Sequence, residues 1–139
     1  MIRREDGLVL TCERAKPRGA WQIPQGGIEK GETPDEALFR EVLEETAVPA
    51  GSVTIVGRAS RWLTYEHPDR LRRKKNSLGQ TQLWFLLQLE DSIEVVSPQE
   101  PEFISARWTP FQRAVDDVVD FKRHLYEMVG DEFADHLVR

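Results

Sequence analysis

The sequence is poor in residues that form cross-links or soft metal sites. It has one cysteine, Cys12, so no disulfide can form within the chain, and its three histidines show no spacing typical of zinc ligands or of a catalytic triad. We expect Cys12 to be a small buried thiol on a strand, and His67, His124 and His136 to lie on the surface. A reducing compartment suits such a chain, so we expect a cytoplasmic protein.

Long apolar runs are also missing. The longest, LWFLL at residues 83–87, is far shorter than the roughly 20 residues that cross a membrane, and the opening MIRREDG lacks the apolar stretch of a signal peptide. No repeat, low-complexity tract or long linker divides the chain. With 139 residues, 40% of them hydrophobic and 31% charged, the sequence predicts one compact domain spanning residues 1–139.

Hydrophobic periodicity predicts strands and helices in mixed order. A helix is expected from Pro34 to about Thr46, with Thr33 as its N-cap, and the tail from Pro110 onward also patterns as helix. Strands are expected at residues 7–13, 52–65, 80–89 and 102–108. The sequence therefore predicts an α+β fold, an α/β/α sandwich in which a mixed β-sheet lies between helices.

Three glutamates crowd one turn of the first predicted helix. Glu41, Glu44 and Glu45 lie at i, i+3 and i+4, so their carboxylates share one face and repel by roughly 0.2–0.5 kcal/mol per pair. Arg40 can offset part of this repulsion by contacting Glu44. A divalent cation would offset more, because Mg²⁺ and Mn²⁺ favour carboxylate oxygens and usually bind phosphate as well. The acidic face is thus a candidate metal site.

The spacing of this segment matches a known signature, G-x(5)-E-x(7)-R-E-U-x-E-E-x-G-U, in which U is aliphatic. The matching positions are Gly26, Glu32, Arg40, Glu41, Val42, Glu44, Glu45 and Val48. The segment therefore resembles the Nudix box of the Nudix hydrolases. Ala47 replaces the last glycine of the signature. That glycine usually adopts the left-handed conformation, in which alanine is less stable than glycine by about 1 kcal/mol.

The resemblance implies a Nudix fold and metal-dependent hydrolysis of a pyrophosphate linkage in a nucleoside diphosphate derivative. The implied metal ligands are Glu41, Glu44, Glu45 and the backbone carbonyl of Gly26. Bound Mg²⁺ or Mn²⁺ would neutralise the phosphoryl group under attack and lower the pKa of a water molecule, with Glu41 and Glu45 as catalytic carboxylates. Arg40 and Glu32 are expected to form a structural ion pair that holds the loop against the helix.

Segments outside the box are similar to one group within the family. WQIPQGG, RWLTY, GQTQLWFLLQL, PEF and VDFKR resemble segments of the bacterial RNA pyrophosphohydrolases and related dinucleoside polyphosphate hydrolases. This likeness adds Glu102 as a metal ligand or general base, where the alternative is a loop carboxylate with no role. The implied substrate is the 5′-triphosphate of RNA or a dinucleoside polyphosphate.

The same likeness suggests how a nucleotide would be held. Phe121 and Val119 could form an apolar platform for the 5′-terminal base, Tyr65 could stack on a neighbouring base, and Lys122 could contact a phosphate. Periodicity gives Val119 an alternative place in the core of the last helix. Further cations come from Lys16, Arg18 and the run at residues 70–75. A solvated basic loop is the commoner explanation of such a run.

Several features keep alternatives open. Ala15 and Ala20 stand where the RNA enzymes carry an arginine and a serine, so the substrate could differ. The sequence ahead of residue 7 does not match the first strand usual in this group, so we expect that strand to be missing. Three explanations are open: the true start codon lies upstream, the sheet lacks one edge strand, or another chain completes that edge. A monomer and a homodimer both fit. A Nudix-like sensor without hydrolysis is the second functional class, against which the intact glutamates favour an enzyme.

Overall fold

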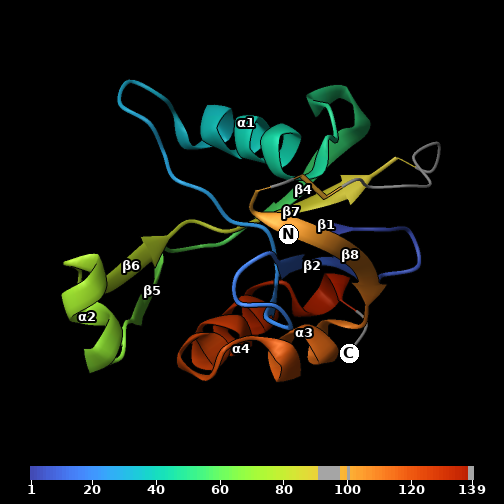
Figure 1. Ribbon diagram of the computed structural model, residues 1–139. Coiled ribbons are helices and arrows are strands. Elements are labelled where there is room, and N and C mark those ends of the chain that lie inside the picture. The colour runs from blue at the N-terminus through green and yellow to red at the C-terminus, as the bar shows by residue number, and fades with distance from the viewer. Residues whose placement is uncertain (91–97, 100, 138–139) are drawn as a thin grey trace.

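The computed structural model describes residues 1–90, 98–99 and 101–137 and places a mixed β-sheet between helices (Figure 1). Its strands are β1 (Ile2–Arg3), β2 (Val9–Arg14), β3 (Trp21–Gln22), β4 (Val53–Arg58), β7 (Phe85–Leu89) and β8 (Phe103–Thr109). The order is β3-β2-β1-β7-β4, with β8 paired to β2. β1 and β7 are parallel, whereas the other ladders of this sheet are antiparallel. The predicted α+β class is confirmed.

Helices cover both faces of this sheet. α1 (Pro34–Thr46) lies on one face, and α3 (Phe111–Asp117) and α4 (Arg123–Glu132) lie on the other (Figure 1). Side chains of β7 alternate between two cores, Leu86 packing with the α3 and α4 cluster and Leu87 with the α1 cluster. None of the described helices is long and apolar enough to cross a bilayer.

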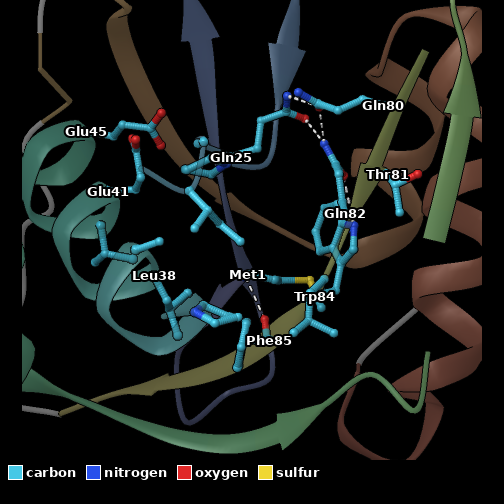
Figure 2. Close-up of a pocket in the computed structure, with 18 of the residues that line it drawn as sticks. Met1, Gln25, Leu38, Glu41, Glu45, Gln80, Thr81, Gln82, Trp84 and Phe85 are labelled. Atoms are coloured by element: carbon cyan, nitrogen blue, oxygen red, sulfur yellow. Dashed lines mark hydrogen bonds between the residues drawn. The ribbon is translucent and has the colours of Figure 1, made fainter. Parts of the chain in front are cut away.

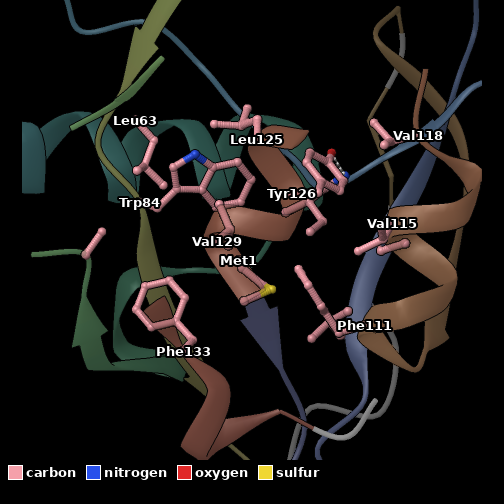
Figure 3. Packing of buried hydrophobic residues seen from close by; sticks show 14 of the residues in the cluster. Met1, Leu63, Trp84, Phe111, Val115, Val118, Leu125, Tyr126, Val129 and Phe133 are labelled. Carbon is pink, nitrogen blue, oxygen red and sulfur yellow. Dashed lines mark hydrogen bonds between the residues drawn. The ribbon is translucent and has the colours of Figure 1, made fainter. Parts of the chain in front are cut away.

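The core beneath α3 and α4 is rich in aromatic residues (Figure 3). Trp84 and Tyr126 meet edge to face, with their ring centroids 5.8 Å apart. The Tyr126 hydroxyl accepts a hydrogen bond from the backbone N–H of Ile23 at 2.9 Å, so this buried polar group is satisfied. On the opposite face Cys12 is fully buried on β2, as predicted.

The two ends of α1 form as the sequence predicts. The hydroxyl of Thr33 accepts a hydrogen bond from the N–H of Glu36 at 3.2 Å, and Pro34 occupies the first helical position. Ala47 ends the helix in the left-handed region, with φ of 60°, and its N–H donates to the carbonyl of Leu43 at 2.9 Å. Alanine thus adopts the conformation that the glycine of the signature normally supplies.

Two segments predicted as continuous strands are divided between sheets. Residues 52–65 form β4 and then β5 (Leu63–Glu66), and residues 80–89 form β6 (Gly79–Gln82) and then β7. β5 and β6 pair in a separate antiparallel sheet. The break falls at Trp84, whose buried ring packs beside Tyr126 while its indole N–H donates to Gln82 at 2.9 Å.

The connection between β5 and β6 corrects the predicted basic loop. Residues 69–75 form a helix, α2 (Asp69–Lys75), which ends at Asn76 in the left-handed region. Seen in Figure 1, β5, β6 and α2 project away from the main sheet. The basic run is therefore an ordered surface element.

The C-terminal segment is not one continuous helix. α3 ends at Asp117, and the turn η2 (Asp120–Lys122) precedes α4. Val118 is buried in the core, but Val119 lies in the connection and is 37% exposed. Helical periodicity fails for Val119 because α3 ends at Asp117, so neither valine lies in a helix.

The first strand is short, and it lies inside the main sheet. β1 has two residues and lies between β2 and β7, with Ile2 opposite Leu87. The nitrogen of Met1 donates to the carbonyl of Phe85 at 2.8 Å. Since β1 lies inside the strand order, the strand that was expected to be missing is present as a two-residue strand.

Candidate active site

A salt-bridged clamp fixes the loop before α1. Nε and Nη2 of Arg40 donate to the two carboxylate oxygens of Glu32 at 2.7 and 2.9 Å, and Nη2 also donates to the carbonyl of Gly27 at 2.7 Å. The hydrogen bonds from Arg40 are the main reason that the pKa of Glu32 falls to about 2. The predicted structural ion pair is confirmed, and it holds residues 26–32 against the helix.

The three glutamates of α1 differ sharply in their surroundings. Glu45 is 8% exposed, whereas the side chain of Glu44 is 58% exposed. Burial, together with the neighbouring charges of Glu41, Glu102 and Glu44, raises the pKa of Glu45 to about 8. A buried carboxyl group surrounded by other carboxylates is stable only when it is protonated or shares a cation.

Gly26 lies directly against the acidic face. A Cβ atom at this position would stand 2.0 Å from Cδ of Glu41, so any larger residue here would displace the Glu41 carboxylate. Gly26 is not among the glycines with positive φ, so the close contact with Glu41, and not the backbone conformation, favours glycine here. The backbone at Gly26 is thereby brought beside the Glu41 carboxylate, in keeping with the metal ligand that the resemblance implies.

In this structure, two carboxylates of the acidic face bind Arg40. Nη1 of Arg40 donates to Glu41 at 2.8 Å and to Glu44 at 3.2 Å. Within the described ranges, no three acidic, histidine or cysteine side chains stand close enough together to hold an ion as they are. Glu102 is exposed just before β8, and its charge acts on Glu45. The donor set suits a hard divalent cation once Glu41 and Glu44 turn away from the guanidinium.

A cavity of about 320 Å³ opens beside these carboxylates (Figure 2). Glu41 and Glu45 stand at one rim, and Leu38 contributes to an apolar wall. Gln80 and Gln82 lie across the opening, on the small sheet. The cavity therefore has a carboxylate side, an apolar side and an amide side, which is typical of pockets that bind a polar ligand with an apolar part.

Three glutamines, Gln25, Gln80 and Gln82, form a hydrogen-bonded chain for which the sequence predicts no role. Nε2 of Gln82 donates to Gln25 at 2.9 Å and to Gln80 at 2.8 Å, and Oε1 of Gln25 accepts from Lys122 at 3.3 Å. The alternation of glutamine in GQTQ on a strand is a signal that both side chains share a face. This chain links the cavity to the lysine in η2.

Lys122 is buried beside an aromatic ring. It is 6% exposed, and Nζ lies 5.2 Å from the ring centroid of Tyr65. Burial, together with the charges of Arg14 and Lys75, lowers the pKa of Lys122 to about 8. A cation held with few counter-charges is suited to a phosphate ligand.

The aromatic residues around Lys122 pack against one another. Phe121 lies 6.0 Å from both Tyr65 and His67, measured between ring centroids. Tyr65 is 7% exposed, so little of its ring is available to a base, while Phe121 is half-buried and Val119 is exposed. His67 is 6% exposed, which corrects its predicted surface position; His124 and His136 are exposed as expected.

Comparison with known proteins gives consistent matches over almost the whole chain. The model of the NUDIX domain family matches residues 1–129. The RNA pyrophosphohydrolase of Halorhodospira halophila is 40% identical over 142 residues, covering 99% of this chain and 78% of the relative. That of Aeromonas hydrophila subsp. hydrophila is 43% identical over 141 residues, covering 96% and 80%.

Solved structures agree. The E. coli dihydroneopterin triphosphate pyrophosphohydrolase superposes with a TM-score of 0.74 at 26% identity, covering 91% of this chain and 88% of that chain. A binary complex of C. elegans Ap4A hydrolase has a TM-score of 0.69 at 18% identity, covering 96% and 95%, which is a likeness of fold alone.

Proposed function

We propose, from the premise that the chain belongs to the NUDIX domain family, that it removes pyrophosphate from the 5′-triphosphate end of RNA. One observation carries this proposal: the carboxylates of Glu41 and Glu45 share a cavity with Gln25, which binds the buried cation of Lys122. A triphosphate could thus meet acidic groups that hold a metal and a lysine that holds a phosphate. The relatives named RNA pyrophosphohydrolases support RNA as the substrate.

Nudix hydrolases generally use divalent metal ions. We infer that Mg²⁺ or Mn²⁺ is held here by Glu41, Glu44, Glu45, Glu102 and the carbonyl of Gly26. When bound, such an ion supplies charge neutralisation at phosphate and a more acidic water molecule. Glu45, whose pKa is raised to about 8, must lose its proton to act as a ligand.

The chain's own residues would divide the remaining work. Arg40 keeps the loop of Gly26 in place through Glu32 while it releases Glu41 and Glu44 to the ion. Lys122 would bind a phosphate oxygen, and Phe121 with Val119 would contact the 5′-terminal base. Water then adds to phosphorus, the anhydride bond breaks, and pyrophosphate leaves.

The test compares substrates directly. The protein is incubated with Mg²⁺ and, separately, with triphosphorylated RNA, diadenosine tetraphosphate, a nucleoside triphosphate or a nucleotide sugar. We expect the highest kcat/KM for triphosphorylated RNA, with release of pyrophosphate. A higher kcat/KM for diadenosine tetraphosphate would make the dinucleoside polyphosphate the substrate, and Ala15 and Ala20 would then explain the altered preference. No hydrolysis of any of the four would contradict the enzyme itself.

A further inference from the structure

The helix α2 gathers positive charge on a protein whose net charge is −5. Arg72 has a structural role: its Nε donates to the carbonyl of His67 at 2.8 Å, and its guanidinium pairs with Glu66 and Asp69. The remaining cations of the helix are exposed and make no ion pair within the part of the chain that the structure describes: Arg70, Arg73, Lys74 and Lys75.

Helix stability explains only part of this charge. Arg73, Lys74 and Lys75 lie in the last turn and complement the negative C-terminal end of the helix dipole, but Arg70 lies in the first turn, where a cation opposes the dipole. Arg70 also lies at i, i+3 and i, i+4 from Arg73 and Lys74, so their like charges repel on one face. An anionic ligand would remove this repulsion.

The charge of α2 is continuous with the proposed nucleotide site. β5, which carries Tyr65, leads through His67 and Pro68 directly into α2. His67 contacts Tyr65 edge to face, with ring centroids 5.4 Å apart. The charge of Lys75 also acts on Lys122, since it contributes to the lowered pKa of that lysine. Basic and aromatic groups therefore extend from Lys122 onto the projecting helix.

We propose that α2 binds the sugar-phosphate backbone of single-stranded RNA downstream of the nucleotide held at Lys122 and Phe121. This inference rests on the proposed function. Long cationic side chains bind phosphates without recognising the base sequence. The half-buried ring of Phe121 nearby can stack on an unpaired base, which favours a single strand over a duplex. Lys75, whose charge acts on Lys122, begins the contact, and Arg70, Arg73 and Lys74, which share one face of the helix, continue it. The helix makes the enzyme prefer a long RNA over a short 5′-triphosphorylated end.

The test uses the double variant Arg73→Gln/Lys74→Gln of the full chain. A control for the loss of two positive charges, Arg4→Gln/Arg113→Gln, removes two partly or fully exposed cations from other elements, where they pair with Asp6 and Asp117. KM and kcat are measured for a triphosphorylated 20-nucleotide single strand and for a triphosphorylated dinucleotide, at several salt concentrations. Binding of a 5′-hydroxyl 20-mer, measured by fluorescence anisotropy, provides a readout that needs no hydrolysis.

We expect the test variant to have a KM for the 20-mer that is several-fold higher than that of wild type, and a KM for the dinucleotide within twofold of wild type. The slope of log(1/KM) against log salt should become shallower by roughly 0.7 for each phosphate that the variant no longer neutralises. Binding of the 5′-hydroxyl 20-mer should weaken in parallel.

Three outcomes would overturn the inference: equal KM for the 20-mer in the test variant and wild type, an equal rise in KM for both substrates, or the same rise in the control variant. If one of these outcomes is found while the wild-type protein still hydrolyses RNA, the inference about α2 is wrong and the proposed function stands. A wild-type protein that hydrolyses neither RNA contradicts the proposed function and this inference together.

Discussion

At the scale of single residues, the carboxyl group of Glu45 is expected to affect both the stability of the fold and the proposed hydrolysis. Its burial among other carboxylates is unfavourable without a cation, and the proposed metal binding would account for its position. We expect Glu45→Gln to fold normally and to lose at least two orders of magnitude in kcat, because the amide cannot supply the charge that an ion requires. The control is Glu36→Gln, an exposed carboxylate of the same helix, which should keep nearly full activity. A near-normal kcat in Glu45→Gln would remove Glu45 from the metal site.

The raised pKa of Glu45 also gives a pH dependence with a definite sign. Between its usual pKa of 4.5 and about 8, the folded protein binds more protons at this group than the unfolded chain, so its contribution to stability falls as pH rises. In metal-free buffer, the melting temperature of Glu45→Gln minus that of wild type should therefore increase from pH 5 to pH 8.5. Thermal scans on both proteins measure this difference, and a difference independent of pH would contradict the buried charge.

Lys122 gives a pH dependence of stability with the opposite sign. Its pKa falls from 10.5 to about 8, chiefly through burial, so the charged lysine destabilises the fold by on the order of 3 kcal/mol below pH 8. This penalty fades between pH 8 and 10.5. We expect Lys122→Met to raise the melting temperature at pH 7, by less at pH 10, and to raise KM for triphosphorylated RNA at least tenfold. Lys30→Met, at an exposed position, is the control. A lower melting temperature together with an unchanged KM would assign Lys122 to the fold alone.

At the scale of elements, the end of α1 offers a clean test of backbone conformation. Ala47 has φ of 60°, where glycine is more stable than alanine by about 1 kcal/mol. Ala47→Gly should raise the melting temperature by a few degrees and leave kcat unchanged. Ala37→Gly, inside the same helix, should lower it, because glycine weakens a helix interior and removes a buried methyl group. Equal effects of the two substitutions would contradict a left-handed Ala47.

Elements whose signals are local could be predicted from the sequence. The limits of α1 follow from Thr33 and Pro34 at one end, and its acidic face follows from residue spacing alone. Elements shaped by distant contacts could not. The break at Trp84 depends on packing against Tyr126, and the bend after Asp117 places Val119 outside the core. Periodicity reports which residues repeat, and it carries no information about partners far away in the chain.

At the scale of the whole molecule, the candidate site joins segments that lie far apart in sequence. Glu45 comes from α1, Gln80 from the small sheet and Lys122 from η2, and the Gln25 amide links the last two to the cavity. The carboxylates could be predicted because they lie within one helix. The glutamine chain could not, because its hydrogen bonds exist only after β6 pairs with β5 and η2 packs beside them.

The division of work between core and site can be measured on two aromatic residues. Phe121 is half-buried and should stack on a base, so Phe121→Ala is expected to weaken binding of triphosphorylated RNA by roughly 1–3 kcal/mol and to raise its KM accordingly. Hydrolysis of inorganic polyphosphate should be unaffected. Tyr65 is buried in the core, so Tyr65→Ala should instead lower the melting temperature sharply, since truncation of a packed aromatic ring costs about 3–5 kcal/mol.

Tyr65→Phe is the control for the second substitution, because it keeps the ring and removes only the hydroxyl that donates to Gln80 at 3.2 Å. Its melting temperature should stay close to that of wild type, and any rise in KM would then report the hydrogen bond with the glutamine chain. If Phe121→Ala lowers the melting temperature strongly while KM stays constant, Phe121 belongs to the core. The 5′-terminal base would then have to contact another surface, of which the exposed Val119 is the nearest in sequence.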